Sequence, residues 1–170
     1  HPKEYWQDEF FIAKGLGLDC IEFILDFKDA EENPLLNPAG LEEIIYISSA
    51  TGVSIESICA DYFMEAPLHS ENETNVEKSI DVLNRLIFNA NILGVKDIVI
   101  PCVDQSSLRI NGGIERFTLN ISRLTNNIEK RNINLSLETD LPPRDFVNLL
   151  DAINSKNVTV NYDIGNSASL

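Results

Sequence analysis

The chain has 170 residues, of which 44% are apolar and 24% are charged, an ordinary composition for a globular protein with one sizeable core. Its 13 basic and 27 acidic residues give a net charge of -14, which disfavours nucleic acid and anionic membranes as partners because both are negatively charged. No apolar run approaches the ~20 residues that span a bilayer. The first residues, HPKEYWQDEF, do not form a signal peptide, so we expect a cytoplasmic protein.

Strand patterns alternate with helix patterns along the whole chain. The chain opens within a helical pattern, in which Trp6, Phe10 and Ala13 recur at helical spacing. The predicted strands begin at about residues 19, 54, 97, 134 and 158 and read DCIEFIL, SIESICA, DIVIPC, NLSLETD and NVTVNYD. Between them we expect helices over 38–51, 76–93, 114–128 and 143–153, and loops over 26–37 and 61–74.

Strands separated by single helices predict an α/β fold with a parallel sheet. Two architectures fit, a doubly wound open sheet and a (β/α)8 TIM barrel. A doubly wound sheet needs nearly continuous apolar strands, because helices cover both of its faces. In this sequence most of the predicted strands instead carry polar residues at every second position, which would point to one face of the sheet. The polar positions are Cys20, Glu22, Ser57, Cys59, Asp61, Ser136, Glu138, Thr159, Asn161 and Asp163. No glycine-rich phosphate loop follows the first strand either, so the pattern favours the barrel.

A complete barrel takes ~250 residues. The chain opens on a helix without a preceding strand and closes on a strand without a following helix. We therefore predict that residues 1–170 form a single partial TIM-barrel domain of about five strands, lacking the first strand and the C-terminal units.

The three cysteines, Cys20, Cys59 and Cys102, lie in or at the ends of predicted strands. They have no metal-binding spacing, and we expect reduced, mostly buried thiols. A nucleophilic cysteine would need a histidine partner, and neither His1 nor His69 is near a cysteine in the sequence. His69 lies on a polar loop, where a solvent-facing side chain is more common than a metal ligand.

Acidic residues follow the predicted strands at the end where the loops of a barrel converge and where barrel enzymes place their chemistry. They are Glu22, Asp61, Asp104, Glu138, Asp140 and Asp163. Like charges gathered in this way repel unless a cation lies among them, so the pattern suggests a divalent metal site. Oxygen ligands suit Mg or Mn better than Zn. Asp61, Asp104 and Asp140 could instead cap the helices that follow them.

The runs GLDCIEF, SICADYFMEAPL, LGVKDIVIPCVDQSSL, LSLETD and NYDIGNSAS, in this order, resemble the xylose isomerase-like barrel superfamily of sugar-phosphate isomerases and epimerases. Within it the sequence is most similar to L-ribulose-5-phosphate 3-epimerase or hexulose-6-phosphate isomerase-type proteins, over about residues 5–170. The resemblance implies one divalent metal ion held by Glu, Asp, His and a second Glu. Glu138 matches the first glutamate and Asp163 the aspartate, while the other two ligands would lie beyond Leu170.

For the intact protein the resemblance implies isomerisation or epimerisation of a ketose or ketose phosphate through an enediolate, with Glu138 as metal ligand and acid/base catalyst. The fragment alone would then be inactive. Candidate substrate-binding residues are Glu22, Asp61, Asp104, Ser106 and Asn166. Tyr62, Phe63 and Met64 could form an apolar wall for the substrate or pack their loop.

Two other functions stay open at this point. An endonuclease IV-like DNA repair enzyme would need several histidine ligands and a basic surface, against which the two histidines and the charge of -14 count. A non-catalytic barrel could keep the fold for binding. We expect a small-molecule sugar or sugar phosphate as the partner, with a homodimer as an open option and no nucleic acid or membrane.

Overall fold

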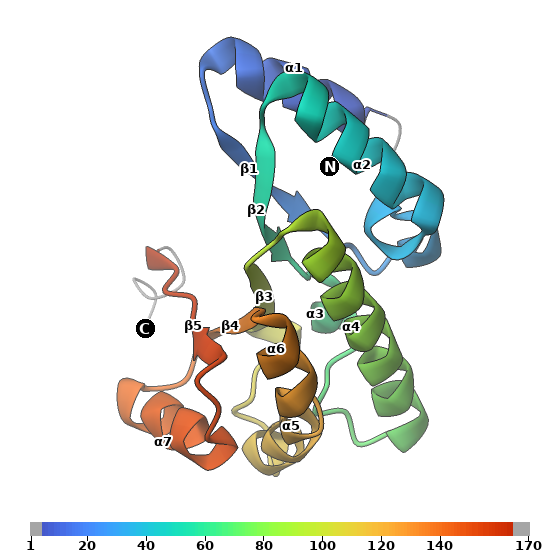
Figure 1. Ribbon diagram of the computed structural model, residues 1–170. Coiled ribbons are helices and arrows are strands. Elements are labelled where there is room, and N and C mark those ends of the chain that lie inside the picture. Colours follow the sequence, from blue (N-terminus) through green and yellow to red (C-terminus); the bar gives the residue numbers. More distant parts are fainter. Residues whose placement is uncertain (1–4, 165–170) are drawn as a thin grey trace.

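The structure, a computed structural model, describes residues 5–164, which form one parallel sheet of five strands in sequence order (Figure 1). The strands are β1 (Cys20–Ile24), β2 (Ser54–Cys59), β3 (Asp97–Cys102), β4 (Asn134–Thr139) and β5 (Val158–Val160). The helices are α1 (Trp6–Leu16), α2 (Pro38–Thr51), α3 (Tyr62–Glu65), α4 (Glu73–Leu93), α5 (Gly113–Ser122), α6 (Thr125–Arg131) and α7 (Pro143–Ile153). Short 3-10 turns cover Ala30–Glu32, Pro34–Leu36 and Asp104–Ser106.

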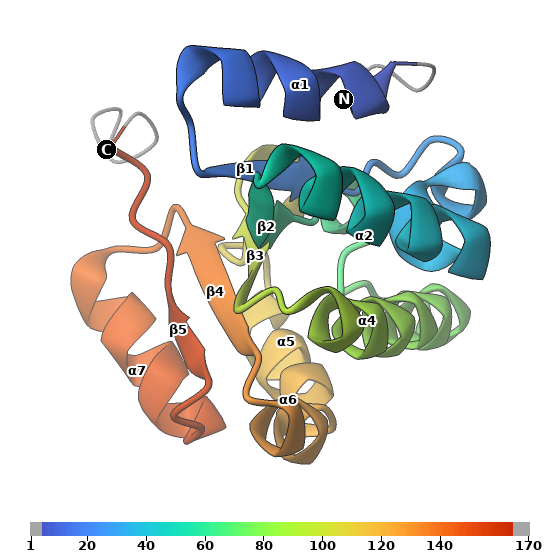
Figure 2. The same ribbon diagram turned by 45° about the horizontal axis from the view of Figure 1, so that its top comes forward.

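The sheet is curved, and the long helices lie along its convex side from α1 round to α7 (Figure 2). In the part of the chain that the structure describes, no long helix lies on the other side of the sheet (Figure 2). A doubly wound sheet would carry helices on both faces. The arrangement is therefore that of an incomplete (β/α)8 barrel, which confirms the predicted fold class.

The core fills the space between the strands and the helices. Leu135 and Leu137 of β4 are fully buried, as are Leu83 and Leu86 of α4 and Phe117 of α5. Because successive strand residues point to opposite faces, burying the leucines of β4 against the helices turns Ser136 and Glu138 toward the concave side. The alternation that favoured a barrel thus also sets which side chains face its interior.

Local sequence signals fix where the helices begin and end. Asn37 accepts a hydrogen bond from the Gly40 backbone N–H at 2.7 Å and starts α2, and Asn72 caps α4 in the same way at 3.2 Å. Gly94 ends α4 with a φ of 77°, in the left-handed region that glycine adopts without strain. The turn at Gly94 therefore lets β3 begin at Asp97, shortly after the end of α4.

Three local expectations are wrong. The stretch 61–74 is not all loop, because α3 forms at its start. The helix expected over 114–128 is two helices, since a tight turn in which the Leu124 N–H bonds to the Ile121 carbonyl separates α5 from α6. Cys20 is exposed because β1 is the edge strand of the described sheet, whereas Cys59 is half-buried and Cys102 buried.

Within residues 5–164, no helix is both long and apolar enough to cross a membrane.

A leucine pair on the helical layer tests the packing. Leu86 of α4 is 0% exposed and Leu119 of α5 is 68% exposed. We expect Leu86→Ala to lower the free energy of unfolding by about 2–5 kcal/mol, because it leaves a cavity, and Leu119→Ala to change it by less than about 0.5 kcal/mol. Urea unfolding followed by circular dichroism measures both, and equal losses would contradict the assigned core.

Candidate active site

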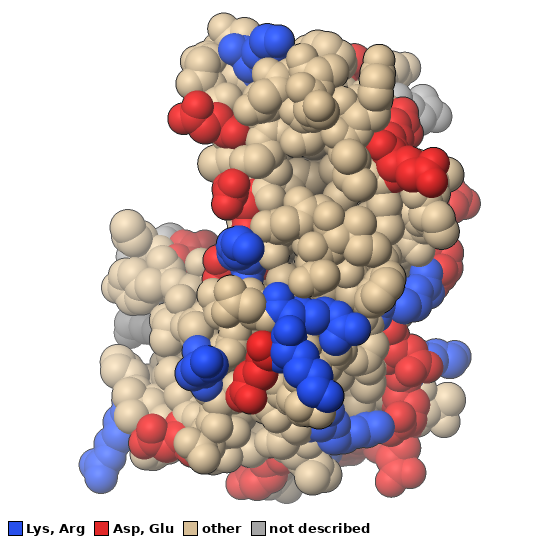
Figure 3. Space-filling model, in the orientation of Figure 1, with Lys and Arg blue, Asp and Glu red and all other residues tan. Residues whose placement is uncertain are grey.

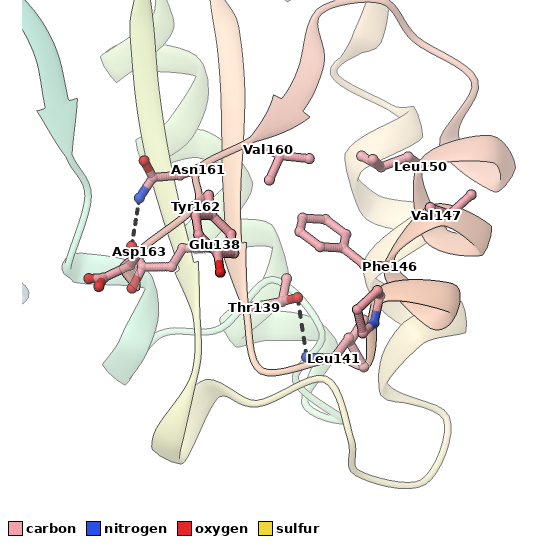
Figure 4. Close-up of a pocket in the computed structure, with 11 residues that line it drawn as sticks. Glu138, Thr139, Leu141, Phe146, Val147, Leu150, Val160, Asn161, Tyr162 and Asp163 are labelled. Atoms are coloured by element: carbon pink, nitrogen blue, oxygen red, sulfur yellow. Dashed lines mark hydrogen bonds between the residues drawn. The ribbon is translucent and has the colours of Figure 1, made fainter. Parts of the chain in front are cut away.

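A cavity of about 400 Å³ opens beside the carboxyl ends of β4 and β5 (Figure 4). Glu138, Asn161 and Asp163 gather at one side of it. The opposite wall is apolar and consists mainly of Leu141, Phe146, Val147, Leu150 and Val160, from α7, the loop before it and β5. A polar end facing an apolar wall is typical of small-molecule sites.

Strand pairing places the polar side chains of this cavity. β4 and β5 are parallel, with Leu137 opposite Val160, and the Asn161 N–H continues the ladder to the Leu137 carbonyl at 2.8 Å. The Asn161 side chain donates a 2.8 Å hydrogen bond from Nδ2 to Oε2 of Glu138. Asp163, two residues farther along, lines the same cavity. The two predicted metal ligands are thus neighbours across one strand pair.

The pKa values of two thiols, Cys59 and Cys102, are affected by the charges around this end of the sheet. Burial raises the pKa of Cys59 well above its usual value, helped by a 3.2 Å hydrogen bond to Asp61 and by the charges of Asp61, Glu22 and Glu138. Burial also raises the pKa of Cys102, with further contributions from the charges of Asp140 and Glu138. Glu22, Asp61 and Glu138 thus lie near Cys59, and Glu138 and Asp140 lie near Cys102. Neither thiol suits a nucleophile, because only the thiolate attacks.

The acids of this region have partners of their own. Glu22 accepts a hydrogen bond from the Ser57 hydroxyl at 2.6 Å across β1 and β2. Both carboxylate oxygens of Asp140 accept from Ser107, at 2.9 and 2.8 Å, which ties the loop after β4 to the loop after β3. Asp61 directly precedes α3 but its side chain makes no capping bond there.

The other predicted substrate contacts lie farther from the cavity. Asp104 is exposed at the start of a 3-10 turn. Ser106 is buried, and its hydroxyl donates to the carbonyls of Pro101 and Val103, so it stabilises its own loop. Asn166 lies outside the described residues. None of the backbone or side-chain contacts tests substrate binding, and these assignments stay predictions.

His69 is not solvent-facing, contrary to expectation. It is 2% exposed, and its ring meets Phe117 edge-on at 6.3 Å between centroids. Its carbonyl accepts a 2.8 Å hydrogen bond from Nε of Arg116, and Asn120 holds the neighbouring carbonyl of Leu68. The loop before α4 is therefore clamped onto α5, whose residues are distant in sequence.

Tyr62 and Phe63 pack their own segment rather than the cavity. Both are buried, and the Tyr62 ring lies 5.2 Å from the rings of Phe27 and Phe63. The apolar lining of the cavity comes instead mainly from Phe146, Val147 and Leu150 of α7. Asn161 was visible only as one member of the polar strand parity.

The residues at the cavity fit part of a metal shell. Glu138 and Asp163 supply carboxylate oxygens, which Mg and Mn prefer. No group of three or more His, Cys, Asp or Glu side chains within the described ranges could hold a metal ion. Two ligands of the expected four are thus brought together in this part of the chain.

Comparison with known proteins agrees with this geometry. A family model described as "Xylose isomerase-like TIM barrel" matches residues 10–169. The chain is 25% identical over 168 residues to a probable L-ribulose-5-phosphate 3-epimerase, UlaE, of Mycoplasma pneumoniae, covering 95% of this chain and 55% of that protein. It is 26% identical over 100 residues to a putative L-ribulose-5-phosphate 3-epimerase, SgbU, of Escherichia coli, covering 58% of this chain and 35% of that protein. The chain thus spans about half the length, or less, of these relatives.

Solved structures share the fold. A xylose isomerase-like TIM barrel protein from Mycobacterium smegmatis, in complex with magnesium, superposes with a TM-score of 0.77 at 19% identity, covering 100% of this chain and 60% of that one. An L-ribulose 3-epimerase superposes with a TM-score of 0.68 at 16% identity, covering 91% of this chain and 54% of that one. These likenesses establish the barrel architecture. Where the barrel begins and ends in the natural protein stays a prediction.

The burial of His69 predicts a pH dependence of stability. Burial lowers the pKa of His69 below its usual value, the charge of Arg116 lowers it further, and a hydrogen bond to the Ser107 backbone opposes both. As the pH falls below about 6.5, His69 takes up a proton in the unfolded chain before it does so in the folded chain. Protonation therefore favours the unfolded chain, and the free energy of unfolding decreases as the pH falls from about 6.5 toward the pKa of His69 in the folded chain. Unfolding free energies at about pH 7.5 and 5 should differ less in His69→Gln than in the native chain. If the difference in unfolding free energy between the two pH values is the same in both proteins, buried His69 does not have a lowered pKa.

Thiol reactivity tests the surroundings of the cysteines. At about pH 8 we expect one thiol, Cys20, to react rapidly with an aromatic disulfide reagent, because it is exposed. Cys59 and Cys102 should react slowly, since both have raised pKa values. Cys20→Ser should remove the rapid phase. A rapid phase that persists in this variant would show that a thiol beside the carboxylates is reactive after all.

Proposed function

Since the chain belongs to the xylose isomerase-like TIM barrel family, we propose that its protein is a divalent-metal-dependent epimerase or isomerase of a ketose or ketose phosphate. The observation that carries the proposal is the cavity in which Glu138 and Asp163 stand opposite an apolar wall. The names of the two curated relatives favour a ribulose phosphate as the substrate class.

The reaction requires removal of a proton from the carbon beside the ketose carbonyl, which leaves an enediolate. Glu138 is proposed as the group that takes or returns this proton, since its carboxylate lines the cavity and is oriented by Asn161. Epimerisation also needs a proton carrier on the opposite face of the substrate carbon. The acids described here all approach from the strands of one sheet, so that second carrier is expected elsewhere in the protein.

Glu138 and Asp163 are proposed to hold a Mg or Mn ion, which would stabilise the negative charge that develops on the carbonyl oxygen. Glu22 and Asp61 are proposed to accept hydrogen bonds from sugar hydroxyls, because their charges act on the same region as Glu138.

The DNA-repair alternative has no specific feature in its favour. On the face shown in Figure 3, basic side chains appear from the top of the molecule to its lower left, with a small cluster near the centre, and acidic side chains lie among and around them. Separately, Lys130 and Arg131 lie in the last turn of α6, and the Arg131 guanidinium carbon lies 5.7 Å from the centroid of the Phe88 ring. Binding to the phosphate backbone of DNA would need a longer continuous row of basic side chains.

We also retain the homodimer as a proposal for the oligomeric state.

Replacing Glu138 tests the mechanism in the full-length protein. Glu138→Gln keeps the size of the side chain but removes the proton carrier, so turnover of L-ribulose 5-phosphate should fall by about 10²–10⁴-fold. Glu42→Gln, an exposed change on α2, is the matched control and should leave turnover unchanged. A chelator should abolish the native activity, and added Mn or Mg should restore it. Near-normal turnover in Glu138→Gln with its metal retained would refute the assigned role.

A further inference from the structure

Asn161 connects the segment that leads to Asp163 with the carboxylate of Glu138. β5 ends at Val160, yet the main chain of Asn161 still bonds to the Leu137 carbonyl of β4 at 2.8 Å. Its side-chain amide bonds to Oε2 of Glu138, also at 2.8 Å. One residue therefore holds β4 by main chain and by side chain, two positions before Asp163.

The negative charges around Glu138 explain why a hydrogen bond from Asn161 is needed. Glu138 shares its surroundings with Glu22 and Asp61 around Cys59, and with Asp140 around Cys102. Like charges that lie close together repel, and a hydrogen bond from a neutral donor helps to hold the Glu138 carboxylate in place. Because Glu138 and Asn161 are both only partly exposed, the bond is better shielded from competing water than a surface contact.

The chemistry of the donor also fits. An ionised carboxylate has about four lone-pair sites, and one amide donor occupies a single one of them. An arginine or lysine in this place would neutralise the carboxylate and compete with a cation. The amide of Asn161 orients Glu138 and leaves its negative charge in place.

We infer that Asn161 is a positioning residue that sets the geometry of Glu138 and Asp163 toward a divalent cation. This inference rests on the proposed function. Partners that orient metal ligands in this way affect metal affinity or activity by about 10–100-fold when they are removed. No ligand role is assigned to Asn161 itself.

The fold should tolerate changes at this position. One layer deeper in the sheet, the hydroxyls of Ser136 and Thr159 are 2.9 Å apart, and Ser136 also bonds to Asp97 at 3.0 Å. These contacts and the main-chain ladder join β4 to β5 without the Asn161 side chain. Loss of the amide therefore alters the strand ends more than the strands.

The test compares Asn161→Ala and Asn161→Leu in the full-length protein. The first removes the amide without adding a charge, and the second replaces it with an apolar side chain of similar size. The same two changes at Asn126, exposed on α6, are the matched controls. Electron paramagnetic resonance measures the affinity for Mn²⁺ alone, circular dichroism the folded fraction, and sugar-phosphate turnover at saturating Mn²⁺ gives kcat and KM.

We expect both Asn161 variants to remain folded and to bind Mn²⁺ about 10–100-fold more weakly, with a lower kcat that excess Mn²⁺ does not fully restore. The Asn126 variants should match the native protein. If Asn161→Leu does not fold, Asn161→Ala decides. Mn²⁺ affinity within about twofold of native in a folded Asn161 variant would overturn the inference while leaving the proposed function standing. A native protein that neither binds Mn²⁺ nor interconverts sugar phosphates would overturn both.

Discussion

Parallel pairing between β4 and β5 determines which side chains meet at the carboxyl end of this sheet. With Leu137 opposite Val160, the leucines of β4 point to the helices and Glu138 to the concave side, where Asn161 meets it. A shift of one residue in this register would send Glu138 into the helical layer, where a charged group has a high desolvation cost. The burial of Leu135 and Leu137 therefore fixes the geometry of the cavity as well as the stability of the sheet.

The same alternation of strand residues brings several carboxylates near one another, and the proposed chemistry would use their negative charge. Several carboxylates lie near the strand ends, where burial raises the pKa values of Cys59 and Cys102 and the carboxylate charges raise them further. Short hydrogen bonds from Ser57, Ser107 and Asn161 hold three of these carboxylates without neutralising them. A site that keeps its negative charge in this way is suited to a divalent cation and to proton transfer.

Much of the fold could be predicted from the sequence, because strand and helix periodicity are local properties. The five strands begin within one residue of their predicted starts, although β5 ends at Val160 and so leaves Asp163 beyond the strand. The runs NLSLETD and NVTVNYD pointed to Glu138 and Asp163. The burial of His69 could not be predicted, since Phe117 and Arg116 lie almost fifty positions away, on α5. Asn161 was inconspicuous for the same reason: its importance comes from a partner on another strand, Glu138, and no spacing rule reveals such a contact.

We propose that β4–β5 pairing presents Glu138 and Asp163 to one divalent cation. Anomalous diffraction from crystals of the full-length protein soaked in Mn²⁺ locates the ion independently of any activity. We expect an anomalous peak within bonding distance of both carboxylates, with the Asn161 amide hydrogen-bonded to Glu138. A Mn²⁺ peak bound by neither carboxylate would contradict it.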